Sequence, residues 1–523
     1  MNNEQEYQYN SCISRGICSI NPTTASLQEV IILYLKTISF YGLKLEEMGI
    51  KDKKIFTLVL NTISMLSSNY EISAKNFEVI NSAFQTEIPR VIEEYEKQCS
   101  IQNLECEKLE SNYVLNKSTD INDYIRLGEK EFRKRLLSLP SEILNLYRIL
   151  FLLTKSIAIN LITYEGYGYE MQSEQSFILK ILNLLNYNPQ PKKELKKLLL
   201  ETADRDCELM LKIRTVQENK YGKQEESQVS FTTTKGKAML VIGSNLRELE
   251  HILEELKNTN IDIYTHDNMM LAHTFPKFKE YKNLKGQFGQ GMENCLLDFS
   301  TFPGPIILTK NSLYNVENLY RGRLFTTDFA YSKGVIPIKN NDFSEVISSA
   351  ENSRGFRTGK DCASEKIGFS YDNMREKIDK KLKEEIYTQI IVIGTRGYSK
   401  DEDGYFKTFL KHIPKNILVI SFTCCKEQDN ILCINAEYDN IAFLKFSKYI
   451  IKQSSKKVNI FFPFCDRHTL SIILNTVKCR PNKIFVGNWN QIILKPNILE
   501  SLKRNFGVLE ISTPKKDLSS IDK

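Results

Sequence analysis

The chain has 523 residues, of which 41% are hydrophobic and 26% charged, as in a globular protein of two to four domains. A net charge of only +7 and short basic runs such as Lys192–Lys197 argue against nucleic-acid binding. No segment resembles a signal peptide, and the longest apolar run, Ile149–Thr163, is shorter than a bilayer span. We therefore expect a cytoplasmic protein, not bound to membranes, whose 12 cysteines are reduced core thiols or metal ligands rather than disulfides.

Residues 1–225 are predicted to form a helical domain. Ser26 and Glu29 have the capping-box spacing that opens a helix, and the apolar stripe after them stops at Gly49. The polar stretch Glu218–Gln228 marks the end of this domain. Further helical periodicity covers residues 55–67, 76–97, 123–162, 176–185 and 193–217.

Two α/β domains are predicted next, at residues 226–380 and 381–523. Short apolar runs at Ala238–Gly243 and Ile261–Tyr264 flank a helical pattern, which indicates a βαβ unit of a parallel sheet. A second such series starts at Gln389–Gly394. Further strands are predicted at 306–309, 324–327, 417–422, 458–462 and 483–487, and helices at 246–257, 374–385, 403–412, 440–453, 468–477 and 497–506.

The predicted fold class is therefore multidomain α and α/β, with an N-terminal helical bundle followed by two Rossmann-like parallel-sheet domains. Ligands of open α/β sheets bind at the carboxyl ends of the strands, so the loops there are the candidate sites. Gly243 and Gly394 end strands without opening a G-x-G-x-x-G run or a P-loop, so the sequence does not support nucleotide binding of those types.

Three stretches, AHTFPKFKEYKNLKGQFG at residues 272–289, FSTFPGPIILTKN at 299–311 and RLFTTDF at 323–329, resemble the hybrid-cluster protein family. This family is also called prismane protein or hydroxylamine reductase. Its members hold a mixed iron–sulfur–oxygen cluster in an α/β core through His, Glu and Cys ligands. The resemblance covers nearly the whole chain, and it implies the family's architecture and an oxidoreductase of the hydroxylamine reductase type.

The N-terminal CISRGICSINPTTASLQ resembles half of the family's four-cysteine segment, which binds a cubane iron–sulfur cluster. Cys12 and Cys18 match its last two ligands, and its first two have no counterpart. A cubane needs four thiolates, so this half-site would need a second subunit or other cysteines to complete it. Alternatively, the two cysteines are relics that pack as small hydrophobes.

The mixed-cluster ligands of the first α/β domain are replaced. The family's Gly-His-Asp-Leu loop reads Gly-Ser-Asn-Leu, which puts Ser244 at a histidine ligand position. Its Thr-His-Gly-Glu turn reads Thr-His-Asp-Asn, which keeps His266 but puts Asn268 at the carboxylate ligand position. Ser312 stands where the family has a cysteine.

The second α/β domain keeps more of the pattern. Arg396 takes the position of the persulfide-bearing cysteine, and Glu437 that of another thiolate. Cys424 matches a thiolate ligand, and Asp466 stands where the family has Glu. Of the seven mixed-cluster positions, one is thus identical and one conservative, so the resemblance implies that the hybrid cluster has been lost.

Coordination chemistry supports that loss. Iron–sulfur clusters need thiolates, whereas a serine hydroxyl stays protonated and an amide oxygen is neutral. A guanidinium has no lone pair to give and must be paired when it is buried. We therefore predict that Arg396 forms an ion-pair cluster with Glu437 and Asp466 in the space that the family uses for its metal.

Three functions remain open from the sequence. The first is a hydroxylamine reductase-type enzyme with a redox partner protein, whose site would have to be rebuilt. The second is a cluster-less paralogue that acts as a regulatory or partner subunit, alone or in an oligomer, or that binds a small polar ligand through Arg396, His266 and Ser312. The third, hydrolysis by Ser312, His266 and Asp466, lacks a nucleophile-elbow pattern. A rebuilt metal site would draw on Cys424, Cys425, Cys433, Cys465 and His266.

Overall fold

The computed structural model describes the chain except at residues 1–21, 68–73, 110–117, 119, 187–189, 290–294, 311–319, 321, 329–333, 396–399, 424, 488–495 and 523. It divides into two compact units whose main parts are Met1–Leu195 and, from Lys196, the rest of the chain. The boundary falls inside helix α8 (Lys192–Tyr221). The domain limits at residues 225 and 380 stay predictions.

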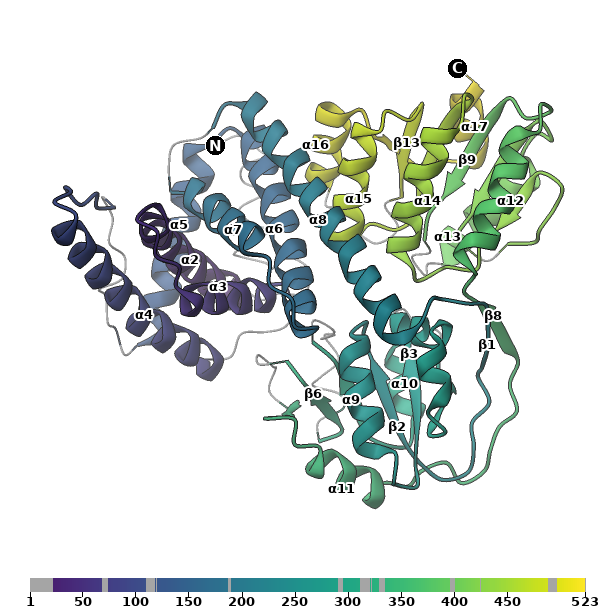
Figure 1. The fold of residues 1–523 in the computed structure, drawn as a ribbon, viewed down its shortest axis with the longest axis horizontal. Coiled ribbons are helices and arrows are strands. Elements are labelled where there is room, and N and C mark those ends of the chain that lie inside the picture. The colour runs from purple at the N-terminus through teal and green to yellow at the C-terminus, as the bar shows by residue number, and fades with distance from the viewer. Residues whose placement is uncertain are drawn as a thin grey trace. The chain divides into compact units, whose positions relative to one another are not determined.

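The described part of the first unit is helical (Figure 1). Helix α2 is buried nearly all round, because its Leu, Ile, Tyr and Phe side chains are not confined to one stripe. It contacts α3, α4, α5 and α7, and so forms the core of this unit. The helices are α2 (Pro22–Glu47), α3 (Lys53–Met65), α4 (Ala74–Ile101), α5 (Ile121–Ser138), α6 (Ser141–Gly166) and α7 (Gln172–Leu184).

The start of α2 differs from the sequence expectation. The helix begins at Pro22, whose fixed φ suits a first helical residue, and the Ser26 hydroxyl donates to the Pro22 carbonyl at 2.9 Å. The capping-box prediction at Ser26 is therefore wrong. The predicted end is confirmed, since α2 stops at Glu47 and Gly49 has a φ of +82°. A Cβ at Gly128 of α5 would overlap the Ser26 carbonyl oxygen, so the two helices pack at backbone distance.

Helix α6 is the one helix among the described residues that is long and apolar enough to cross a membrane. In its most apolar window 61% is buried inside the protein, and Leu146, Ile149, Leu150 and Leu153 are fully buried. A core helix of a helical bundle has these properties too, which agrees with the buried helix predicted for this segment.

The second unit contains two six-stranded sheets, and every strand pair in them is parallel. The predicted fold class is confirmed. The first sheet has the order β4 (Leu284–Gln287), β3 (Ile261–His266), β2 (Lys237–Ile242), β5 (Ile306–Leu308), β6 (Leu324–Thr326) and β7 (Ile336–Pro337). Its helical segments are α9 (Leu246–Leu256), η3 (Asp267–Thr274), η4 (Pro276–Glu280), α10 (Cys295–Thr301) and α11 (Ser344–Asn352).

The second sheet repeats this plan. Its order is β11 (Ile431–Cys433), β10 (Ile417–Ser421), β9 (Gln389–Ile393), β12 (Lys457–Phe462), β13 (Lys483–Val486) and β14 (Leu509–Glu510). The helices are α12 (Tyr371–Lys383), α13 (Lys400–Lys411), α14 (Asn440–Gln453), α15 (Arg467–Lys478), α16 (Pro496–Phe506) and α17 (Pro514–Asp522). A separate antiparallel ribbon joins β1 (Ser227–Ser230) to β8 (Ser364–Ile367).

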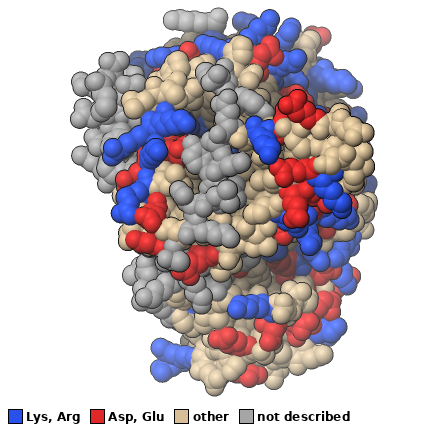
Figure 2. Space-filling model, turned by 90° about the vertical axis from the view of Figure 1, so that its left-hand side faces the viewer, with Lys and Arg blue, Asp and Glu red and all other residues tan. Residues whose placement is uncertain are grey.

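Basic and acidic side chains are mixed over the face in Figure 2, without a continuous basic stripe among the described residues. Many surface cations have a carboxylate beside them, as in the pairs Lys192–Glu142 and Arg205–Glu201. Such pairing weakens the positive potential that attracts nucleic acid. That the chain binds no nucleic acid stays a prediction from the sequence.

Two cysteine pairs are bonded, which corrects the expectation of reduced thiols. Cys99–Cys106 lies in the first unit and Cys425–Cys433 in the second, with Cα atoms 5.9 Å and 6.1 Å apart. Both separations suit a disulfide. Cys207 is a buried free thiol, as expected.

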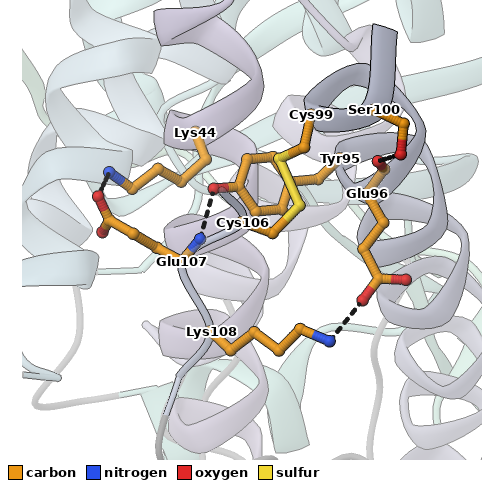
Figure 3. Close-up of a disulfide and its surroundings, with 8 residues drawn as sticks. All are labelled: Lys44, Tyr95, Glu96, Cys99, Ser100, Cys106, Glu107 and Lys108. Carbon is orange, nitrogen blue, oxygen red and sulfur yellow. Dashed lines mark hydrogen bonds and ion pairs between the residues drawn. A yellow bond between two sulfur atoms is a disulfide. The ribbon is translucent and has the colours of Figure 1, made fainter. Parts of the chain in front are cut away.

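The Cys99–Cys106 disulfide fastens the segment that follows α4 back onto that helix (Figure 3). Cys99 is 2% exposed in the last turns of α4, where its side chain meets the returning chain. In that segment the Glu107 amide donates to the Tyr95 hydroxyl at 3.1 Å, and its carboxylate pairs with Lys44 of α2 at 3.1 Å. The segment after α4 is thus held by the disulfide and by polar contacts to α4 and α2.

Replacing Cys106 by Ser is expected to lower the free energy of unfolding by about 2–3 kcal/mol, because a disulfide restricts the unfolded chain. Urea unfolding followed by circular dichroism measures the change. Cys362→Ser, at an exposed free thiol, is the matched control, with an effect below about 0.5 kcal/mol. Equal midpoints for wild type and Cys106→Ser would show that this bond does not form.

Candidate functional site

Ser244 follows the carboxyl end of β2. The strand ends at Ile242, and Gly243, with a φ of +123°, turns the chain toward α9. Asn245 caps α9 by accepting a hydrogen bond from the Glu248 amide at 3.2 Å. Ser244 lies between turn and cap with its side chain exposed to solvent. A solvated hydroxyl at this position is a poor iron ligand.

His266 ends β3 and is fully buried. Its Nε2 lies 3.0 Å from Oδ2 of Asp298 on α10, and its ring meets the Phe299 ring edge-on. In the tautomer that donates from Nε2 to this carboxylate, Nδ1 keeps a lone pair that can accept a hydrogen bond. Nδ1 has no hydrogen-bond partner among the described residues. A carboxylate behind an imidazole is also how proteins orient a metal-binding histidine.

The turn after His266 carries Asn268 at the position where the resemblance predicts a carboxylate ligand. Asp267, at the family's glycine position, has a φ of +56°, a conformation that Asp adopts more readily than most residues. The Gln287 side chain holds the turn, donating to the Thr265 hydroxyl at 2.6 Å and accepting from the Asp267 amide at 2.9 Å. Asn268 is exposed on η3.

The predicted donors that follow β12 have other partners. Asp466 caps α15, and its Oδ1 accepts from the Thr469 amide at 2.7 Å. Cys465 is buried, and burial raises the pKa of its thiol well above the usual value. At neutral pH this side chain is therefore a thiol rather than the thiolate that a metal needs.

The rebuilt metal site predicted as one alternative requires Cys425 and Cys433 as thiolates. In the structure they are bonded to each other beside the edge strand β11, so neither carries a thiolate. Across the described parts of the chain, no group of three or more His, Cys, Asp or Glu side chains is placed to hold a metal ion.

Five predicted site residues lie outside the described residues: Cys12, Cys18, Ser312, Arg396 and Cys424. The N-terminal half-site and the cluster of Arg396 with Glu437 and Asp466 therefore stay predictions. The triad of the hydrolytic alternative is not formed as predicted, because the carboxylate hydrogen-bonded to His266 belongs to Asp298 rather than Asp466.

Glu437 lies between β11 and α14 and is 6% exposed. It lines a cavity of only about 10 Å³, which has room for one water molecule at most. Gly368 borders the same cavity, with a φ of +77°, and its amide donates to the Asn435 carbonyl at 2.6 Å. A Cβ on Gly368 would lie 2.7 Å from Cγ2 of Thr274. Among the described residues, the cavity that Glu437 lines is therefore too small for a multi-iron cluster.

A buried ion pair next to this cavity was not found from the sequence. Arg214 of α8 makes two hydrogen bonds with Asp439, at 2.8 Å and 2.9 Å, and the two side chains are 7% and 1% exposed. Gln224 donates to Asp439 at 3.1 Å and to the Thr274 hydroxyl at 3.0 Å. Asp439 also caps α14 through the Ala442 amide. Its position just before a predicted helix was the one sequence signal for that cap.

The electrostatics of Asp439 follow from these partners. Burial by itself would raise the pKa of the carboxyl group. The charge of Arg214 and the hydrogen bonds from Arg214, Ala442 and Gln224 outweigh burial and hold the pKa below its usual value. Asp439 is therefore ionised at neutral pH.

Comparison with known proteins gives one consistent result. The family model described as Prismane/CO dehydrogenase family matches residues 8–434. Hydroxylamine reductase of Syntrophobacter fumaroxidans is 23% identical over 99% of this chain and 98% of its own length. The Thermosipho melanesiensis hydroxylamine reductase is 26% identical over 97% of each. A solved acetyl-CoA synthase/carbon monoxide dehydrogenase chain is similar with a TM-score of 0.46, at 11% identity, covering 97% of this chain and 83% of that one.

Asp439→Asn keeps a capping oxygen but removes the charge, and is expected to lower the free energy of unfolding at pH 7 by about 3 kcal/mol. The folded pKa lies below the ordinary value of about 3.9, so this stabilisation is complete above about pH 4 and is lost as the pH falls through the folded pKa. Urea titrations at pH 7, 5 and 3 should show a constant difference from wild type down to pH 5 and a smaller one at pH 3. Asp361→Asn, at an exposed position, is the control. A difference that stays the same at pH 3 would refute this account.

Proposed function

Since the chain belongs to the Prismane/CO dehydrogenase family, we propose that it is a hydroxylamine reductase-like protein in which the hybrid-cluster site has degenerated. The observation that carries the proposal is the exposure of Ser244 and Asn268. These residues stand where the family has a histidine and a carboxylate ligand, yet their neutral side chains face solvent. A hybrid cluster at this site would therefore have no ligand from either position 244 or position 268 of the first α/β domain.

The remaining described positions support the same conclusion. Asp466 is engaged as a helix cap, and Glu437 lies beside a cavity that holds one water at most. The described residues therefore do not fit a hybrid cluster, and no step of hydroxylamine reduction is assigned to them. Any iron would be held at Cys12 and Cys18, in a cubane completed by a second subunit or by other cysteines.

A cluster-less paralogue that acts as a regulatory or partner subunit, or binds a small polar ligand, is the second candidate. The Nδ1 of His266 favours it, because a buried imidazole nitrogen that has no partner among the described residues can accept a hydrogen bond from a ligand. Arg396 and Ser312 would be further donors in that case. A redox partner protein is required only by the enzymatic alternative.

Iron and acid-labile sulfide analysis of protein purified without oxygen, with electron paramagnetic resonance, tests the proposal. We expect no hybrid-cluster signal and no hydroxylamine reduction with a reduced dye as electron donor. About four irons per chain, lost in Cys12→Ala, would establish the N-terminal cubane. Cys362→Ala, at an exposed thiol, is the matched control and should retain that iron. A hybrid-cluster signal that disappears in Cys424→Ala would overturn the proposal.

A further inference from the structure

A polar cavity of about 340 Å³ lies in the second unit, between the ribbon strand β1 and the η4–β4 segment. Strand β4 is the edge of the first sheet, and β1 pairs with β8 alone, so each strand has one edge without a strand partner in the described sheets. A Cβ on Gly286 would overlap the Ser230 carbonyl oxygen, so β1 and β4 meet at backbone distance there. The volume is at the lower end of the range for small-molecule sites.

One wall of the cavity carries two cations. Lys279 lies on η4 and Lys285 on β4, and both line the space. Their side chains are 39% and 35% exposed, and each has a carboxylate partner outside the cavity, Glu225 at 2.6 Å and Asp262 at 3.4 Å. Partly exposed pairs of this kind are weak, so both ammonium groups can turn toward a ligand.

The opposite wall carries hydroxyl groups. Ser227 and Ser230 of β1 line the cavity, and the Ser230 oxygen accepts a hydrogen bond from the Thr232 amide at 3.0 Å. Because that oxygen already accepts, its proton is free to be donated to a ligand. The one acidic side chain in the lining, Glu226, is paired with Lys366 of β8 at 2.7 Å.

His273 lines the cavity without adding charge. Burial lowers the pKa of its imidazole to about 4, and its ring nitrogen Nε2 lies 2.9 Å from the Thr265 hydroxyl. At neutral pH the lining therefore contains two ammonium groups and the Ser230 hydroxyl, against one carboxylate that is already paired with Lys366.

We propose that this cavity binds the oxyanion group, carboxylate or phosphate, of a small molecule. Lys279 and Lys285 supply charge-assisted hydrogen bonds, and the Ser230 hydroxyl of β1 is a further donor. None of these residues occupies a cluster-ligand position. Anion binding at this cavity therefore does not depend on whether the protein holds a hybrid cluster.

Isothermal titration calorimetry of the full chain with inorganic phosphate and, separately, with malonate tests the site. We expect at least one of the two anions to bind, and Lys279→Gln/Lys285→Gln to weaken that binding about tenfold or more, a loss of about 1.4 kcal/mol. Binding of phosphate alone or malonate alone identifies the preferred oxyanion, and binding of both supports the shared chemistry.

Lys277→Gln is the matched control, because Lys277 lies on the same segment, pairs with Glu280 and does not line the cavity. Its affinity should stay within about twofold of wild type. The bound anion should also raise the unfolding temperature of wild type and of Lys277→Gln but not of the double variant. Absence of binding to wild type at millimolar concentrations, or equal binding to the double variant, would overturn the assignment.

Discussion

The ion pair between Arg214 and Asp439 fixes the arrangement of the second unit. It ties α8 to the start of α14, and Gln224 extends the network to Thr274 at the end of η3. A buried charge is tolerated only when it is paired and hydrogen-bonded, so these segments cannot separate without exposing or isolating a charge. The Phe275 ring lies 5.7 Å from the guanidinium and covers it further. One network therefore holds together loops from the carboxyl ends of both sheets.

This constraint explains why the space beside Glu437 is closed. The loop after β11 accepts a hydrogen bond from Gly368, Gly368 packs against Thr274, and the cavity that these residues line measures about 10 Å³. In a protein that used this region for a metal cluster, the same loops would have to stand apart around it. Here these loops are joined by an ion pair and by amide hydrogen bonds. They also pack closely around Gly368, where there is no room for a side chain. The tight packing beside Glu437 is consistent with the proposal that the cluster-ligand positions have degenerated.

The central parts of the fold were predictable from the sequence, because strands of a parallel sheet are buried on both faces and appear as uninterrupted apolar runs. Each predicted strand is present within one or two residues, as β2 and β9 illustrate. The missed strands are short and lie at or near sheet edges, such as β4 with its sequence Leu-Lys-Gly-Gln. The ribbon of β1 and β8 joins segments more than 130 residues apart, and neither has an apolar pattern of its own.

The candidate site was predictable only as a set of positions. The family resemblance places Ser244, Asn268 and Asp466 in loops that do follow the predicted strands. The exposure of Ser244 and Asn268 and the capping by Asp466 depend on local geometry that residue type does not determine. The pairing of His266 with Asp298 and of Arg214 with Asp439 depends on how the chain folds over 32 and 225 residues. No local pattern in the sequence specifies contacts at those separations.

The redox conditions around the protein determine whether the bonded cysteines are disulfides or thiols, and hence whether Cys425 and Cys433 can bind a metal. A reducing compartment such as the predicted cytoplasm keeps thiols free, and both bonds would then open. Cys425, which follows Cys424 in the sequence, and Cys433 would then be thiols, so reducing conditions return two soft donors to the set proposed for a rebuilt metal site. Under oxidising conditions the bond removes two of these donors. The disulfide form described here is therefore the form least able to bind iron in the second sheet, and anaerobic, reduced protein gives the rebuilt site its most favourable test.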